Sequence, residues 1–282
     1  MGMTRPFASV LLLLLAALAP GRALAAPDAE PWPRWERHDA GATATIDHSA
    51  WDGWLKRYVS ADPLGVARVA YGRVGEDGRR ALARYIDGLA AVAVSRHNRA
   101  EQRAFWINLY NALTVRVILD RYPVESILRI NTSPGWLSIG PWGKKLVTVE
   151  GEMLSLDDIE HRILRPVWRD PRIHYAVNCA SVGCPNLRQE AYTGARIEAQ
   201  LDDQARAYVN SWRGAHFEDG GLYVSSIYKW YVADFGGNET GVLAQLRRYA
   251  GGDLAQRLAK TDRIAGYHYD WDLNDAAQPA AE

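Results

Sequence analysis

The chain has 282 residues, of which 48% are hydrophobic and 23% charged, a composition typical of globular proteins and ample for a buried core. Lys plus Arg and Asp plus Glu both number 33, so the formal net charge is zero. This balance argues against a nucleic-acid partner, which would need a basic patch. Eleven Trp and fourteen Tyr against four Phe fit either a groove for a sugar or peptide or ordinary core packing.

The first 25 residues have the pattern of a secretory signal peptide. Arg5 gives a short positive region, an apolar run follows from Phe7 to Ala19, and Ala23-Leu24-Ala25 is a small-x-small cleavage site. The apolar run is shorter than the roughly 20 residues of a spanning helix. The sequence therefore predicts cleavage near Ala25, no transmembrane anchor, and a periplasmic or secreted product.

The remaining chain is predicted to hold one domain. Residues 26–45, rich in Ala, Pro, Gly and polar residues, are predicted to be a flexible mature N-terminus. Apolar residues at helical spacing predict helices over 47–60 and 79–93. With no repeat and no low-complexity linker, residues 46–274 are predicted to form a single α+β domain, followed by a disordered tail over 275–282.

Residues 97–122 carry the longest helical pattern, which Pro123 stops. The pattern is apolar nearly all round, as expected for a central helix, and we expect it to pack on a small, mostly antiparallel sheet. Glu101, Asn108 and Asn111 share one face of this helix. Because buried amides must be hydrogen-bonded, these side chains would either tie loops to the helix or line a site.

A loop and a hairpin are predicted after the central helix. Residues 132–145 form a loop rich in Gly and Pro that carries Trp136 and Trp142, and it is either a lid over a site or a long turn. Alternation over residues 146–154 predicts a hairpin around Glu150-Gly151.

A helix is then expected to begin at Ser155 and to end at Pro166. Glu160 and His161 are adjacent within it, so they would not share a helical face, and a metal pair there is not expected.

Residues 172–187 hold both cysteines of the chain. Their period-two pattern predicts a half-buried strand with His174 and Asn178 on one face, followed by a tight turn that ends at Cys184-Pro185. Two thiols in an oxidising compartment are more often a disulfide than a nucleophile, and both interpretations stay open. The spacing of Cys179 and Cys184 is a weak metal signal without a close His pair, so no metal and no cofactor are expected.

The C-terminal part is predicted to contain more helices and short strands. Helical spacing over 194–212 predicts an amphipathic helix, and residues 222–225 predict a strand. Ser225 or Ser226 then caps an aromatic helix that stops at Gly236-Gly237 and is a candidate wall of a pocket. Two further helices and a last strand, which docks back on the domain, are expected over 238–249, 253–260 and 267–274.

Five segments together resemble the bacterial and plant family called domain of unknown function 547. They are Ala104-Phe-Trp-Ile-Asn-Leu-Tyr-Asn111, Ser155-Leu-Asp-Asp-Ile-Glu-His161, His174-Tyr-Ala-Val-Asn-Cys-Ala-Ser181 with Cys184-Pro185, Ser225-Ser-Ile-Tyr-Lys-Trp-Tyr231 with Asp234-Phe235, and Tyr269-Asp-Trp-Asp-Leu-Asn274. The resemblance implies little chemistry, because no activity is established for the family. The chain departs from the family pattern at Gly183, where a serine is expected.

A fold-level analogy adds a catalytic hypothesis. A long buried helix followed by a strand with a histidine is similar to the papain-like and transglutaminase-like architecture, although the helix here has no cysteine. In this hypothesis the protein is a hydrolase or acyl transferase of the cell envelope that acts on an amide or ester. His174 would be the general base and Cys184 the nucleophile, and Glu101, Asn108 and Asn111 would orient the base or stabilise an oxyanion.

Two non-catalytic hypotheses stand beside it. In one, the chain is a binding module whose aromatic pocket holds a peptide, glycan or other small molecule of the envelope, with Cys179 and Cys184 oxidised. In the other, the polar cluster only fixes the core of a structural protein. The candidate binding residues are Trp106, Tyr110, Asn178, Ser181, Tyr228, Trp230, Tyr231 and Asp234.

Overall fold

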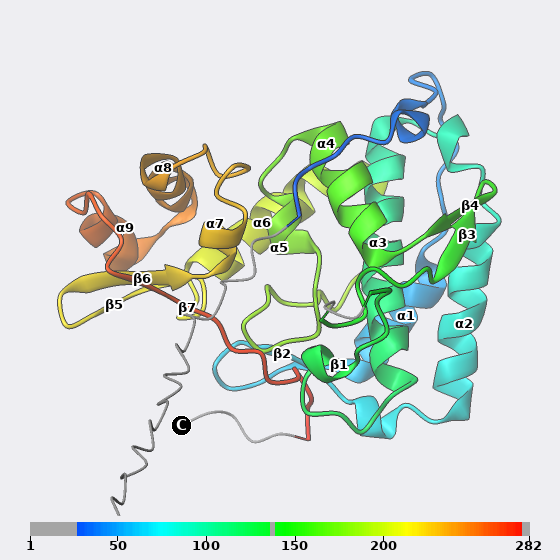
Figure 1. Cartoon of the computed structure of the whole chain (residues 1–282), viewed down its shortest axis with the longest axis horizontal. Coiled ribbons are helices and arrows are strands. Elements are labelled where there is room, and N and C mark those ends of the chain that lie inside the picture. The colour runs from blue at the N-terminus through cyan, green and yellow to red at the C-terminus, as the bar shows by residue number, and fades with distance from the viewer. Residues whose placement is uncertain (1–26, 136–138, 278–282) are drawn as a thin grey trace, which may run out of the picture.

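Helix α3 (Arg99–Leu119) runs through the middle of the fold in the computed structural model, which describes residues 27–135 and 139–277 (Figure 1). Every residue from Glu101 to Leu119 except Arg116 is buried, which confirms the predicted central helix. Asn98 caps it by accepting a hydrogen bond from the Glu101 amide at 3.0 Å. The predicted signal peptide, Trp136 and residues 278–282 lie outside the described residues.

The neighbours of α3 are helices. It packs against α2 (Glu76–Ala90), the π-helical segment η5 (Asp158–Leu164), the short η6 (Gly194–Arg196) and α6 (Ile197–Val209). The fold is α+β as predicted, but the expectation that the central helix rests on a sheet is wrong. The strands are too short to cover a helix that is apolar all round, so other helices bury it.

The N-terminal half is built from α1 (Ser49–Tyr58), α2 and two small hairpins. Strands β1 (Val59–Ala61) and β2 (Ala67–Val69) pair antiparallel, and the sequence did not predict them. The predicted hairpin is confirmed as β3 (Val147–Val149) and β4 (Glu152–Leu154). Its turn residues Glu150 and Gly151 have φ of 45° and 85°, the left-handed region that glycine adopts readily.

The C-terminal part forms a second hydrophobic cluster around α6 and a three-stranded sheet (Figure 1). Strand β6 (Gly221–Ser225) pairs antiparallel with β5 (Ala215–Glu218) and parallel with β7 (Gly266–His268). The predicted helices appear as α7 (Ile227–Trp230), α8 (Glu239–Tyr249) and α9 (Gly252–Leu258), and α7 gives way to turns before the predicted end at Gly236.

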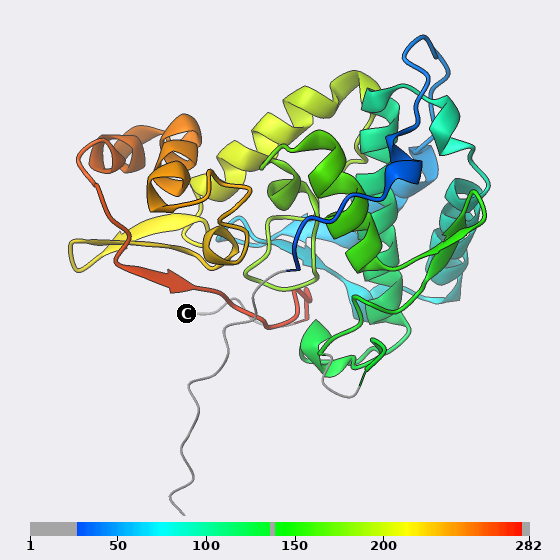
Figure 2. The ribbon, with the colours of Figure 1, turned by 45° about the horizontal axis from the view of Figure 1, so that its top comes forward.

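The chain returns from β7 across the molecule to the N-terminal half (Figures 1 and 2). Leu273 N donates to Glu125 O at 2.8 Å, and Val69 N donates to Asn274 O at 2.8 Å. The tail was expected to be disordered from residue 275, but the Asp275 side chain is fixed by a hydrogen bond from Tyr122 at 2.7 Å. The segment therefore joins the two hydrophobic clusters.

Residues 27–45 are also docked, in contrast to the flexible segment expected from their composition. Glu30 N and Trp32 N donate to the carbonyl oxygens of His161 and Arg162 at 3.0 and 3.1 Å. Trp35, in the 3₁₀ helix η1 (Pro33–Glu36), is buried. Burial of tryptophan surface stabilises the docked segment, although its composition is typical of a free tail.

Segment η5 continues directly into α4 (Arg165–Trp168), so the prediction that Pro166 ends this helix is wrong. Pro166 has no amide hydrogen to donate to the preceding turn, and the carbonyl oxygens of His161 and Arg162 accept instead from Glu30 N and Trp32 N. The helix ends instead at Arg169, whose φ of 48° is left-handed. π-Helical turns are rare and often occur at functional sites.

Candidate functional site

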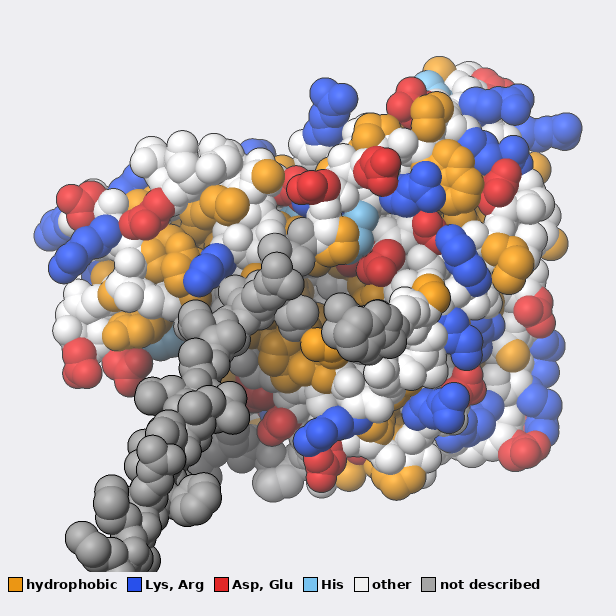
Figure 3. All heavy atoms as spheres, in the orientation of Figure 1, with side chains coloured by type: hydrophobic (Ala, Val, Ile, Leu, Met, Phe, Trp, Pro, Cys, Tyr) orange, Lys and Arg blue, Asp and Glu red, His pale blue; other side chains and the backbone are white. Residues whose placement is uncertain are grey.

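A cavity of about 580 Å³ lies where the two hydrophobic clusters meet. Figure 3 shows hydrophobic side chains gathered near the centre of one face of the molecule. The size suits a small ligand or a fragment of a larger one. The described lining comes from α3, the 133–143 loop, η5, the 174–185 segment, α7 and the C-terminal segment, and consists of Pro27, Tyr110, Ser133, Pro134, Ile139, Trp142, Gly143, Asp157, Glu160, His161, His174, Val177, Cys179, Cys184, Pro185, Ile227, Trp230, Tyr231, Tyr269 and Trp271.

His174 lines the cavity from the short helix α5 (Ile173–Ala176), so the predicted strand is wrong. Residues 173–178 are all buried, and the alternation of apolar and polar residues therefore marks no solvent-facing side. The His174 ring stacks on Tyr231 with centroids 4.0 Å apart, and its Nε2 lies 2.6 Å from Asp234 Oδ2. Asp234 thus orients the imidazole from behind the cavity, as carboxylates do in many histidine sites.

Asp234 also accepts a hydrogen bond from Arg165 Nε at 2.6 Å. Burial alone would raise the pKa of this carboxyl group, but hydrogen bonds and positive charge from His174 and Arg165 hold the pKa well below its usual range. Asp234 therefore stays ionised and holds the side chains of His174 and Arg165 in place.

Glu160 and His161 reach the cavity from η5. Glu160 Oε1 lies 3.9 Å from His174 Nδ1. Burial opposes ionisation of Glu160, but His161, His174 and hydrogen bonds from Tyr110 and Tyr231 together lower its pKa. A buried carboxylate is thus kept ionised at the bottom of the cavity.

His161 takes its tautomer from Arg165. Arg165 Nη1 lies 3.1 Å from His161 Nδ1, and since arginine only donates, this nitrogen accepts. Burial lowers the pKa of His161, so the ring is neutral, with its proton on Nε2, which lies 3.6 Å from Asp157 Oδ1.

Asp157 is the more exposed of the two cavity carboxyl groups, with 41% of its side chain accessible. Burial, together with the charges of Glu160 and Asp158, raises its pKa to about 6. We call Asp157, Glu160, His161 and His174 the polar floor. Among the described residues that line the cavity, none is Lys or Arg.

Four rings form what we call the aromatic wall: Trp142, Trp230, Tyr269 and Trp271. The centroid of Tyr269 lies 4.7 Å from those of Trp230 and Trp271, and Trp142 lies 6.1 Å from Trp271. The predicted pocket residues Trp230, Tyr231 and Tyr110 do line the cavity. Trp142 shows that the 132–145 loop contributes to the cavity as well.

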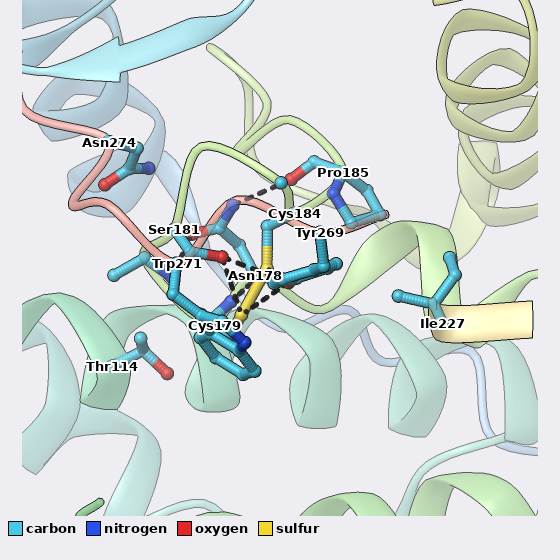
Figure 4. Close-up of a disulfide and its surroundings, with 12 residues drawn as sticks. Thr114, Asn178, Cys179, Ser181, Cys184, Pro185, Ile227, Tyr269, Trp271 and Asn274 are labelled. Atoms are coloured by element: carbon cyan, nitrogen blue, oxygen red, sulfur yellow. Dashed lines mark hydrogen bonds between the residues drawn. A yellow bond between two sulfur atoms is a disulfide. The ribbon is translucent and has the colours of Figure 1, made fainter. Parts of the chain in front are cut away.

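Cys179 and Cys184 form a disulfide in the cavity wall, with Cα atoms 6.3 Å apart (Figure 4). Tyr269 Oη donates to Cys184 Sγ at 3.1 Å. The two cysteines are the only ones in the chain, so no free thiol remains. The disulfide interpretation is confirmed, and Cys184 in this state cannot be the predicted nucleophile.

Asn178 and Ser181 shape the disulfide loop and are not part of the cavity lining. Asn178 Nδ2 donates to Pro185 O at 2.7 Å, and its Oδ1 accepts from Ala180 N at 2.8 Å. Ser181 Oγ donates to Tyr269 Oη at 3.0 Å. Their role here is to hold the loop, because their polar atoms are already paired within it.

The polar residues of α3 anchor loops. Asn108 exchanges two hydrogen bonds with the Tyr192 backbone, at 2.8 and 3.0 Å. Asn111 Nδ2 donates to Ala176 O at 3.0 Å, and its Oδ1 accepts from Asn178 N at 2.9 Å. Neither asparagine lines the cavity, so the expectation that both share a polar cluster with the His174 side chain is wrong.

Three other predicted site residues lie outside the cavity lining. Glu101 accepts from Ile46 N at 3.1 Å, far along α3 from the polar floor. Trp106 is buried against Trp35, with centroids 5.0 Å apart, and Tyr228 is buried against Phe235. Their burial follows from packing needs, which aromatic residues serve as often as they serve ligands.

Sequence reasoning missed Asp157, Glu160, His161, Tyr269 and Trp271. Adjacent residues of a regular α-helix do not share a face, and Glu160-His161 was set aside for that reason. In η5 both side chains reach the same cavity. The available signal was that all five residues fall within segments that carry the family resemblance.

Within residues 27–135 and 139–277, no three His, Cys, Asp or Glu side chains are grouped so that they could hold a metal ion. In the same part of the chain, no helix combines the length and apolarity needed to cross a membrane.

No curated protein and no solved structure matches the chain, so the papain-like analogy stays a prediction. One family model matches, over residues 94–209, and its description is "Protein of unknown function, DUF547". This region includes α3, the polar floor and the disulfide loop, and the match supports the resemblance of these segments to the DUF547 family.

Proposed function

We propose that the protein is an exported, periplasmic or secreted binding module whose cavity holds a peptide or glycan fragment without covalent chemistry. One observation carries the proposal: the thiol that a cysteine mechanism needs is bonded in a disulfide that forms part of the cavity wall. A disulfide also agrees with an oxidising compartment, and the N-terminal sequence pattern agrees with export.

The cavity lining supports binding of a ligand with a flat or apolar face. Trp230, Tyr269 and Trp271 offer ring faces on which a sugar or a side chain can stack, and the polar floor offers hydrogen-bond partners. A few polar groups at the end of a mostly apolar cavity are typical of small-molecule sites.

A titration with short peptides and oligosaccharides tests this proposal. Binding is followed by NMR on the indole N–H signals of the tryptophans. The proteins compared are wild type, Trp230→Ala and the matched control Trp212→Ala. Trp212 is 38% exposed and is not part of the cavity lining. We expect a ligand that binds wild type and Trp212→Ala, binds Trp230→Ala at least about tenfold more weakly, and is recovered unchanged. Equal binding to all three proteins would contradict the proposal.

A second candidate function is hydrolysis by general acid–base catalysis without a thiol. The 2.6 Å contact of His174 with Asp234, next to the ionised Glu160, favours it, because oriented histidines beside carboxylates are common acid–base groups. In that case a ligand from the titration is cleaved, cleavage persists in Cys184→Ser, and His174→Gln lowers the rate by about 10²-fold or more. Recovery of every ligand intact excludes this candidate for the compounds tested.

A further inference from the structure

The charge of the cavity lining is one-sided. Asp157 and Glu160 are its acidic residues, and among the lining residues that the structure describes there is no Lys or Arg to oppose them. Lys145 pairs with Asp158, with its Nζ 2.5 Å from Asp158 Oδ2, and acts on Asp157 only through its charge. Within the described residues, no Lys or Arg nitrogen lies within 4.0 Å of the Asp157 carboxylate; its neighbour is the neutral His161.

Glu160 is stabilised by more protein partners than Asp157. Burial and the charges of Glu160 and Asp158 raise the pKa of Asp157, and the charge of Lys145 offsets this shift only in part, so charged Asp157 has no close cationic partner in the free protein. A ligand with a positive charge would supply this partner, whereas an anionic ligand would add a third negative charge to the same space.

The aromatic wall favours the same class of ligand. The faces of Trp230, Tyr269 and Trp271 line the cavity that the two acids share. Aromatic faces attract cations through their quadrupole, and cages of such rings with nearby acids recognise ammonium groups. The rings would also pack against the carbon skeleton of such a ligand.

We infer that the cavity takes an organic cation, with an ammonium group between Asp157 and Glu160 and its ring or hydrocarbon part on the aromatic wall. This inference rests on the proposed binding function and adds the charge of the ligand to it. Amino groups of peptides and of amino sugars belong to the class; carboxylates and phosphates do not.

Three indoles that carry a polar group on the same two-carbon chain test the charge preference: tryptamine, which is a cation, tryptophol, which is neutral, and indole-3-propionate, which is an anion. Each is titrated at pH about 7.5, above the raised pKa of Asp157, and binding is read from the indole N–H signals of the protein. We expect tryptamine to bind about tenfold more tightly than tryptophol, and indole-3-propionate to bind most weakly.

Asp157→Asn is expected to reduce the preference for tryptamine over tryptophol to about threefold or less. The control variant Asp77→Asn, in which an aspartate with a 95% exposed side chain on α2 is changed, should keep the wild-type preference. Circular dichroism of both variants checks that they are folded.

Equal affinity for the three probes, or preference for the anion, overturns the inference while the binding function stands, provided that Trp230→Ala weakens all three. A preference for tryptamine that Asp157→Asn does not change also overturns it. If none of the probes binds, the inference is wrong, and the peptide and glycan titration then decides separately whether the cavity binds a ligand.

Discussion

At the residue scale, two carboxyl groups three positions apart in one helix have opposite pKa shifts. Burial and nearby acids raise the pKa of Asp157 to about 6, while histidines and tyrosine hydroxyls overcome burial and lower the pKa of Glu160. The difference follows from partners, because Glu160 has donors on several sides and Asp157 faces mainly the cavity. Pairs of this kind are typical of sites that bind or move charge.

The Asp157 shift has a consequence for stability. Its pKa in the folded protein lies above the ordinary aspartate value of 3.8, so the native protein holds this proton more tightly than the unfolded chain does. The charged form therefore destabilises the native state progressively as pH rises from about 4 to about 6. We expect Asp157→Asn to be more stable than wild type at about pH 7, with the difference shrinking towards about pH 4.

Urea unfolding at several pH values measures this effect. Asp157→Glu is the control, since it keeps a titratable carboxyl group at the position. A stability difference between wild type and Asp157→Asn that does not change between about pH 4 and about pH 7 would argue against the raised pKa.

Part of the site could be predicted from residues alone. His174, Tyr231 and Trp230 were identified because histidine and amphipathic aromatic side chains near a loop are typical site residues. Glu160 and His161 were not identified as site residues. The rule that adjacent helical residues do not share a face assumes α-helical geometry, and η5 is π-helical. Hydrogen-bond register inside a helix has no clear signal in one sequence.

At the element scale, the disulfide loop is held on three sides. Asn178 closes it from within, Tyr269 contacts Cys184 Sγ, and Arg213 donates to the carbonyl oxygens of Val182 and Cys184. The loop needs few further constraints to keep its shape. The disulfide therefore contributes to the cavity mainly as a wall and as a block on thiol chemistry.

We expect the native protein not to react with iodoacetamide until it is reduced. Reduction should lower the free energy of unfolding by about 2 kcal/mol, the value for closing so short a loop. Mass spectrometry of labelled protein, with and without reductant, measures the first effect, and urea unfolding measures the second. Rapid labelling of untreated, folded protein would restore Cys184 as a candidate nucleophile.

Helix α3 anchors the same loop from below through Asn111. Replacement of Asn111 by Leu leaves Ala176 O and Asn178 N without partners in a buried place, which should cost about 1–3 kcal/mol. Asn131→Leu, at an exposed position, is the control and should change the free energy of unfolding by less than about 0.5 kcal/mol. Chemical denaturation in which both variants lose equally little stability would refute the anchoring role.

The element types were predictable where one periodicity dominated. The apolar pattern of α3 and the capped pattern of α8 both agree with the structure. The 172–178 segment was wrongly predicted as a strand. It is buried on all sides, and its alternation of apolar and polar residues is the pattern that a half-buried strand would also give. Short apolar runs keep this ambiguity until their neighbours are known.

At the scale of the whole molecule, the cavity depends on parts of the chain that lie far apart in sequence. The family match covers residues 94–209, which hold the polar floor, whereas Trp230, Tyr269 and Trp271 come later. Residues before the match also matter, because α2 packs against α3 and α1 packs against α2 (Figure 1). Such long-range assembly is what a single sequence does not reveal.

We therefore expect the fragment 94–209 not to fold cooperatively when it is produced alone, because it exposes the face of α3 that α2 covers and lacks most of the aromatic wall. Thermal unfolding followed by circular dichroism compares the fragment with residues 27–282. A sharp transition of the fragment, with the near-ultraviolet signal of the longer chain, would show that the matched region is a domain on its own.

A crystal structure of the protein with the strongest ligand from the peptide and glycan titration shows whether the cavity is the binding site. We expect the ligand to lie against Trp230 and Trp271, its polar or charged group to contact Asp157, and the Cys179–Cys184 disulfide to stay intact. A ligand bound outside this cavity, or one covalently attached to Cys184, would contradict this expectation.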